Sequence, residues 1–159
     1  MLLRSQQWCP MEQQPIRFSV QPLPKNQHTL LRKFYRSHNS SMRITQQAEV
    51  WVVRAPSIIA GVCLSPVADG YWLTSLLTAD QYRQQGVARL LIKQVLTAYQ
   101  GAPIWLFCHP DLINFYSKLG FEQAQFLPES LHDRLTRYQQ HKALIGMHYP
   151  ATNSPTQLA

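Results

Sequence analysis

The sequence has few of the residues that build disulfide frameworks, metal centres and membrane spans. Its three cysteines, Cys9, Cys63 and Cys108, are odd in number, widely separated and without CxxC spacing. This pattern argues against a disulfide framework or a zinc site and favours a reducing compartment. No apolar run approaches the roughly 20 residues of a membrane span, and the N-terminal apolar stretch is only two leucines long. We therefore expect a cytoplasmic protein with no bound metal and no membrane partner.

Acidic residues are also scarce, with eight Asp and Glu against fifteen Lys and Arg, which gives a formal charge of +7 at pH 7. Three explanations fit this excess: attraction of an anionic ligand, nucleic-acid binding, or solvation of the surface. The basic residues are scattered, with no dense basic run and no interleaving with aromatic residues. A nucleic-acid partner is therefore unsupported, and we favour electrostatic help in capturing an anionic ligand.

A chain of 159 residues suits one domain with a full core. Residues 15–149 carry the periodic apolar patterns, whereas residues 1–14 are predicted to be an N-terminal extension and residues 150–159 a frayed tail.

Apolar periodicity within the domain predicts strands that alternate with helices. Pro22 and Pro24 are expected to end the first strand, and the polar segment 38–47 is expected to be a loop or a short irregular helix. This order of elements predicts an α/β (α+β) fold with a mixed sheet. Strands are expected near 16–21, 48–54, 57–65, 71–78, 104–108, 121–126 and 143–149, and helices near 26–37, 87–100, 111–119 and 128–142.

Residues 83–88 read Arg-Gln-Gln-Gly-Val-Ala and join a predicted strand to a predicted helix. Backbone N–H groups at a helix N-terminus lack partners, and together with the helix dipole they form a site for a pyrophosphate. Gly86 permits close approach of the backbone, and Ala88 leaves little side chain in the way. A glycine in one strand-to-helix turn is only moderately specific.

A second motif, Asn-Phe-Tyr-Ser-Lys-Leu-Gly-Phe at 114–121, follows about 30 residues later. Together the two motifs resemble the GCN5-related N-acetyltransferase (GNAT) superfamily. Its pyrophosphate loop has the pattern Gln/Arg-x-x-Gly-x-Gly/Ala, and its later helix carries a tyrosine before a Lys-Leu-Gly-Phe type ending. The resemblance covers residues 15–149. It implies a mixed, mostly antiparallel central sheet flanked by helices, and direct transfer of an acetyl group from acetyl-CoA to an amine.

The resemblance also assigns roles to individual residues. The end of the fourth strand would pair with the pantetheine arm and stabilise the oxyanion, and the loop would hold the pyrophosphate. Relatives often carry an asparagine about two turns before the tyrosine, whereas Asn114 stands closer to Tyr116 here. The expected cofactor-binding residues are Leu76, Leu77, Thr78, Arg83, Gln84, Gln85, Gly86, Val87, Ala88, Arg89 and Asn114.

Tyr116 matches the general acid of the superfamily, which would protonate the departing thiolate. The helical spacing of its apolar neighbours leaves open that Tyr116 only packs in the core. Relatives often place a glutamate on the fourth or fifth strand as base, whereas Phe107 stands in the fifth strand here. His109 is the best single candidate for a base. Asp80 and Glu49 are weaker candidates, and deprotonation through water is the default.

Two other functions compete with acetyl transfer. The missing carboxylate base favours a catalytically weak regulatory module that binds acyl-CoA, and the charge suggests a basic nucleic-acid-associated protein. The residues leave open whether the acceptor is a small molecule or a protein, and whether the chain forms a homodimer. They also leave open whether residues 1–14 and the helix near 128–142 shape the acceptor site.

Overall fold

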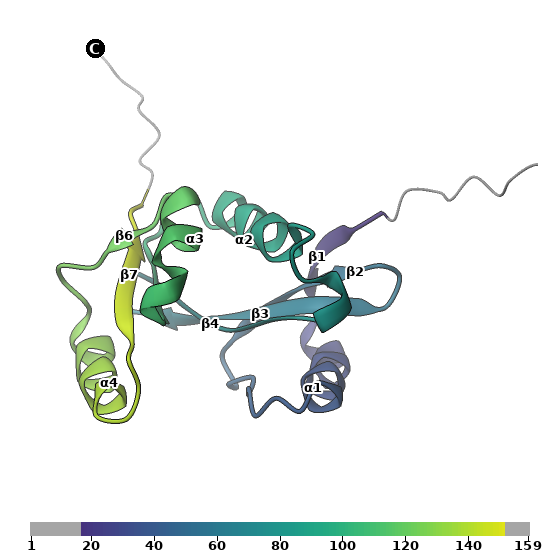
Figure 1. The fold of residues 1–159 in the computed structure, drawn as a ribbon, viewed down its shortest axis with the longest axis horizontal. Helices are drawn as coiled ribbons and strands as arrows, with labels where there is room; N and C mark the ends of the chain where they lie inside the picture. The colour runs from purple at the N-terminus through teal and green to yellow at the C-terminus, as the bar shows by residue number, and fades with distance from the viewer. Residues whose placement is uncertain (1–16, 152–159) are drawn as a thin grey trace, which may run out of the picture.

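The computed structural model describes residues 17–151, which form one seven-stranded sheet with the order β1-β2-β3-β4-β5-β7-β6 (Figure 1). Only β4 and β5 are parallel neighbours, and every other adjacent pair is antiparallel. The predicted fold class, a mixed and mostly antiparallel sheet flanked by helices, is therefore confirmed. The strands are β1 (Ser19–Leu23), β2 (Glu49–Arg54), β3 (Ile58–Val67), β4 (Gly70–Thr78), β5 (Ile104–Cys108), β6 (Glu122–Gln123) and β7 (Ile145–Tyr149).

Helices cover both faces of this sheet, with α2 and α3 on one face and α1 and α4 on the other (Figure 1). The four are α1 (His28–Ser37), α2 (Val87–Ala98), α3 (Ile113–Lys118) and α4 (Glu129–Gln139). A short 3-10 turn lies before each of the first three helices. These turns are η1 (Lys25–Gln27) before α1, η2 (Asp80–Tyr82) before α2 and η3 (Pro110–Leu112) before α3.

Each face has its own apolar core, because successive side chains of a strand point to opposite sides of the sheet. On one side, Leu91 and Val95 of α2 pack with Ile104 and Leu106 of β5. On the other side, the core is built around Leu31, Phe34, Tyr35, Val50 and Val52. Both described cysteines, Cys63 and Cys108, are buried as free thiols.

The first strand differs from its prediction, because β1 continues through Pro22 to Leu23. The expectation that Pro22 ends the strand was wrong. Among the described strands, β1 lies at the edge of the sheet and pairs only with β2, so a residue without an N–H is tolerated there. The predicted extension 1–14 and most of the predicted tail lie outside the described residues.

The sixth strand is also shorter than predicted. β6 covers only Glu122 and Gln123, and Phe126 is 87% exposed. The backbone N–H of Ala124 still donates to the carbonyl of Gly146, after which the chain leaves the sheet and runs to α4.

The parallel contact between β4 and β5 is short, and this positions the site. The two strands pair only at Tyr71 with Ile104 and at Trp72 with Trp105. Beyond this point β4 bends at Ser75, whose φ is +58° and which lies where the β3–β4 register shifts. Leu73 to Thr78 therefore have no pairing strand on the β5 side within residues 17–151, and their backbone groups on that side face the opening.

Within residues 17–151, no helix combines the length and apolar character that crossing a bilayer requires.

Gly70 is the first residue of β4 and packs against Pro103, just before β5. Gly70→Ala should destabilise the fold, because there is no room for a side chain at this contact. A Cβ there would overlap the carbonyl oxygen of Pro103 and lie 2.9 Å from the Trp105 ring. The neighbouring N–H of Tyr71 donates to that same carbonyl at 3.0 Å. Chemical denaturation should show a loss of about 1–3 kcal/mol in the free energy of unfolding. An unchanged midpoint would contradict the tight contact.

Candidate active site

The turn before α2 has an unusual backbone that the sequence motif anticipates. Gln84 and Gly86 both occupy the left-handed region, with φ of +65° and +77°. Gly86 is the N-cap of α2, and no side chain caps the helix. A Cβ built on Gly86 meets no atom within 4 Å, so the space beside this turn is open. The turn thus presents bare backbone to an unfilled region.

The backbone N–H groups of residues 84–89 have no acceptor among residues 17–151. The first helical bond in this region is from the N–H of Leu90 to the carbonyl of Gly86, at 3.0 Å. Unpaired N–H groups at the start of a 12-residue helix carry the positive end of its dipole. This arrangement suits a phosphate or pyrophosphate.

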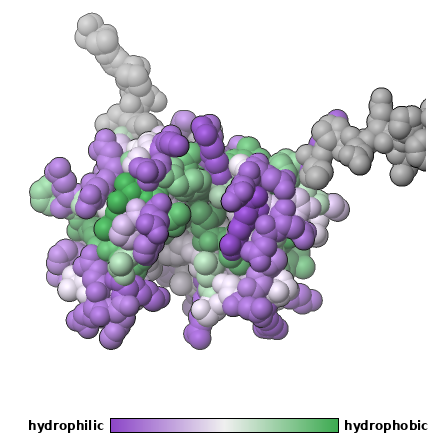
Figure 2. Space-filling model, in the orientation of Figure 1, coloured by the Kyte–Doolittle hydropathy of each residue, from purple (hydrophilic) through white to green (hydrophobic). Residues whose placement is uncertain are grey.

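A cavity of about 250 Å³ brings this turn together with the end of β4 and with α3. Tyr82 and Phe115 form part of its wall although the sequence reasoning assigned them no role. Figure 2 shows apolar surface in the middle of this side of the molecule, bordered by hydrophilic side chains. Of the predicted cofactor-binding residues, the cavity is lined by Thr78, Arg83, Gln84, Gly86, Val87, Ala88 and Arg89.

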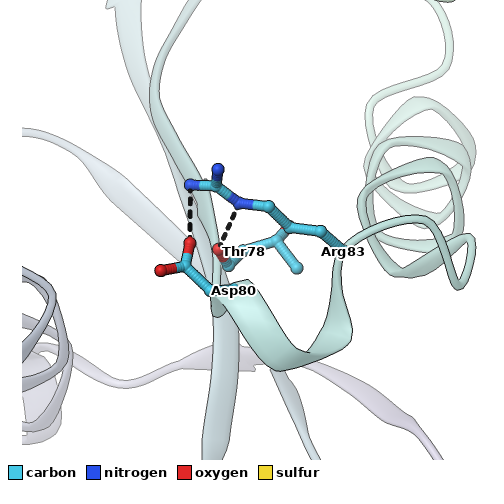
Figure 3. Close-up of polar contacts among 3 residues, drawn as sticks. All are labelled: Thr78, Asp80 and Arg83. Carbon is cyan, nitrogen blue, oxygen red and sulfur yellow. Dashed lines mark hydrogen bonds and ion pairs between the residues drawn. The ribbon is translucent and has the colours of Figure 1, made fainter.

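Arg83 folds back across the end of β4 (Figure 3). Its Nε donates to the carbonyl of Thr78 at 3.4 Å, and its Nη2 lies 3.2 Å from Oδ1 of Asp80. Both side chains are largely exposed, so the ion pair adds little stability and mainly orients the guanidinium. Asp80 is engaged with Arg83, and Glu49 accepts a hydrogen bond from Tyr99. Neither weaker candidate for the base lines the cavity.

Four of the predicted cofactor-binding residues do not line this cavity. Leu76 and Leu77 are half-buried on the part of β4 that does not pair with β5. The side chain of Gln85 donates to the carbonyl of Gln81 at 3.0 Å, which turns it toward η2. Asn114 is exposed on α3.

Tyr116 is buried on α3, with 6% of its surface exposed. Its ring packs edge-to-face against Phe115 and Phe121, at centroid separations of 4.9 and 5.6 Å. Burial, with a smaller effect from the thiol of Cys108, raises the pKa of Tyr116 to about 12. The phenol is therefore protonated at neutral pH, as a proton donor must be, while its ring also serves the core.

His109 follows β5 and begins η3. Its Nδ1 accepts a hydrogen bond from the N–H of Asp111 at 3.1 Å and lies 3.3 Å from a carboxylate oxygen of the same residue. The side chain is 54% exposed and does not line the cavity beside Gly86. The structure therefore uses this imidazole to cap a turn.

On the other face of the sheet, aromatic side chains gather where β4 and β5 separate. Trp72 of β4 lies 5.4 Å from Phe107 of β5, and Phe107 lies 6.2 Å from Tyr138 of α4. The guanidinium carbon of Arg134 stands 4.8 Å from the centre of the Trp72 ring. Phe107, which takes the place of an expected glutamate, thus packs in an aromatic cluster.

Comparison with known proteins gives the class of this fold. Residues 46–123 match the acetyltransferase (GNAT) domain family. Comparison with curated protein sequences gives no significant match.

Several solved protein structures share the fold at low sequence identity. The ribosomal-protein-S18-alanine N-acetyltransferase of Escherichia coli has a TM-score of 0.62 at 15% identity, over 90% of this chain and 99% of that one. Escherichia coli ElaA has a TM-score of 0.62 at 16% identity, over 84% of this chain and all of that one. N-acetylglutamate synthase of Neisseria gonorrhoeae, solved with coenzyme A and N-acetylglutamate, has a TM-score of 0.61 at 10% identity, over 88% of this chain and 36% of that one.

The chain belongs to the GNAT acetyltransferase superfamily, and the resemblance inferred from its two motifs is confirmed. The family match covers the turn at Gly86 and the tyrosine of α3, together with the β4–β5 opening between them.

Tyr116→Phe should change how stability depends on alkaline pH. The folded state holds the pKa of this phenol near 12 against an ordinary value of 10.0, so the stabilisation is complete below pH 10 and is lost as pH rises toward 12. A two-unit difference corresponds to about 2–3 kcal/mol. Denaturation at several pH values should show wild type losing this amount relative to Tyr116→Phe between pH 10 and 12. Parallel curves would contradict the buried position of the hydroxyl.

Proposed function

We propose that this chain is a cytoplasmic enzyme that transfers the acetyl group of acetyl-CoA directly to an amine acceptor. One observation carries the proposal: the N–H groups of residues 84–89 are unpaired within the described chain and border a cavity that reaches the end of β4. Coenzyme A carries a pyrophosphate, for which such a row of donors at a helix start is suited. The net charge of +7 favours capture of this anionic cofactor.

The part of β4 that does not pair with β5 offers a place for the pantetheine arm. Because β4 and β5 pair no further than Trp72 and Trp105, those backbone groups of residues 76–78 that point away from β3 face the opening instead of a strand. An extended pantetheine arm would pair there, and a backbone N–H would stabilise the oxyanion of the thioester carbonyl. A donor of this kind lowers the barrier by about 2.7–4 kcal/mol in enzymes where it has been removed.

The chemistry then requires three proton transfers. The protonated amine loses a proton to water, and its nitrogen attacks the thioester carbon to form a tetrahedral intermediate. The carbon–sulfur bond of that intermediate breaks as Tyr116 donates its hydroxyl proton to the departing thiolate. The second proton of the nitrogen then passes through water to the Tyr116 phenolate, which restores the acid. We assign the deprotonation to water and not to His109, because the imidazole of His109 is engaged in capping η3.

The rival function is a module that binds acyl-CoA with little turnover, and one observation favours it. No Asp or Glu lines the cavity beside Gly86 among the described residues, so no carboxylate base stands there. Tight binding of acetyl-CoA by wild type, with no thiol release in the presence of any amine of a broad panel, would establish this rival.

Gly86→Asp should abolish binding of coenzyme A, since it adds a carboxylate where the pyrophosphate would lie and obstructs the N–H groups. We expect at least about a 100-fold loss of affinity by calorimetry, the equivalent of one or two charge-assisted hydrogen bonds. Gly101→Asp is the matched control. Gly101 follows α2, also has positive φ, and has open space beside it. Equal affinities for wild type and Gly86→Asp would remove the proposed pyrophosphate site.

Tyr116→Phe should lower kcat by about 10²-fold or more, because a positioned acid contributes that much to a transfer reaction. The KM for acetyl-CoA should change little, since the hydroxyl acts late in the reaction. His109→Gln is the comparison variant, and its kcat should stay within about threefold of wild type. Full activity of Tyr116→Phe would rule out the acid role, and a large loss in His109→Gln would make the imidazole a participant.

A further inference from the structure

A second cavity lies between α1 and the beginning of β3, on the sheet face opposite α2. Its volume is about 470 Å³, within the range typical of sites for small molecules. Residues of α1 form one wall, the ends of β2 and β3 form another, and residues 79–82 close a third side. This second cavity includes neither the β4–β5 opening nor the N–H groups of residues 84–89. The two cavities share one lining residue, Tyr82.

The polar lining of this cavity is cationic. Lys33 and Arg54 carry permanent positive charges, and His38 adds an imidazole. No Asp or Glu is among its described lining residues, and neither Lys33 nor Arg54 has an ion-pair partner within residues 17–151. An uncompensated pair of charges around a concave surface attracts anions.

Arg54 supplies an independent indication that this cavity binds an anion. Its Nε is buried and has no hydrogen-bond acceptor among residues 17–151. A buried donor without a partner is costly, and such groups are rare in folded proteins. An oxygen of a bound carboxylate or phosphate, seated against the guanidinium, would compensate the charge, and the planar guanidinium fits both groups.

The remaining lining sets the shape of the ligand. Phe34, Ile58 and Ile59 provide an apolar wall, and Ser37 and Ser57 add hydroxyl groups. We propose that this cavity binds a compact organic anion, with one carboxylate or phosphate against Arg54 and Lys33 and an apolar portion against Phe34 and Ile58. The site is distinct from the proposed cofactor site, and it stands or falls independently of acetyl transfer.

The test must separate the two sites, because Tyr82 borders both and a phosphate would also suit the N–H groups at 84–89. The probes are benzoate and phenyl phosphate, with benzyl alcohol as the neutral analogue, titrated into ¹⁵N-labelled full-length protein at low salt. The titrations use both wild type and Gly86→Asp, the variant designed to lose the cofactor site. We expect both anions to shift the amide resonances of Lys33, Ser37 and residues 57–59 in both proteins, and benzyl alcohol to bind at least about tenfold more weakly.

Charge-removing variants complete the test. Arg54→Gln and Lys33→Gln should each weaken anion binding by about tenfold, as expected for loss of a charge-assisted contact. Arg36→Gln is the matched control, because Arg36 is an exposed cation of the same helix that does not line this cavity. If Arg54→Gln fails to fold, Lys33→Gln on the exposed side of α1 still decides the matter.

Three results would overturn the proposal. Anion-induced shifts confined to residues 84–89 would place the ligand in the other cavity. Equal weakening by Arg36→Gln and Lys33→Gln would reduce the effect to net charge. Equal binding of benzyl alcohol and benzoate would show that the cations do not take part. Coenzyme A binding to wild type is measured in parallel, so failure of one site is recognised without reference to the other.

Discussion

The structure depends on one limited contact, the parallel pairing of β4 with β5 over two residue pairs. If the pairing continued, the backbone groups of residues 73–78 on that side would be hydrogen-bonded to β5. Because it stops at Trp72, the sheet opens and the end of β4 keeps free backbone groups beside the turn that starts α2. The hydrogen bond from the N–H of Tyr71 to the carbonyl of Pro103, and the absence of a side chain at Gly70, fix where the pairing begins.

The turn before α2 makes use of that opening. Two left-handed residues, Gln84 and Gly86, turn the chain so that consecutive N–H groups have no acceptor within the described chain. Such donors are costly to bury and inexpensive to leave facing a cavity, where water or an anion meets them. On the opposite face of the sheet, the guanidinium of Arg134 stacks on the ring of Trp72, which also contacts Phe107. That side of the opening is therefore lined by aromatic rings and a cation.

Much of the fold was predictable because its signals are local. Apolar periodicity located the helices and most of the strands to within a few residues, and the turn at Gly86 was recognised from its glycine and small neighbour. Pro22 was misread because whether a strand lies at an edge depends on the strand order, which local patterns do not contain. The loss of sheet pairing after Gln123 likewise depends on where α4 packs.

The site was predictable only where one segment carries it. The residues of the turn lie together because they are adjacent in the sequence. Tyr82 directly precedes the turn in the sequence, whereas Phe115 joins the turn only through the packing of α3. Phe115 nevertheless stands inside the second motif and was open to recognition. His109 was favoured for its chemistry and its place after β5, but its side chain caps the following turn. Trp72, Phe107 and Arg134 come from three elements, and Lys33 and Arg54 come from two. Local sequence patterns therefore could not show that these side chains lie together.

The most direct measurement is a titration of coenzyme A into the ¹⁵N-labelled wild-type protein, followed by backbone amide resonances. We expect saturable binding, with the largest shifts in residues 84–89 and smaller ones at Leu76 to Thr78, because these N–H groups would receive the pyrophosphate and the pantetheine arm. Binding that leaves the amides of 84–89 unmoved, or no binding at all, would contradict this expectation.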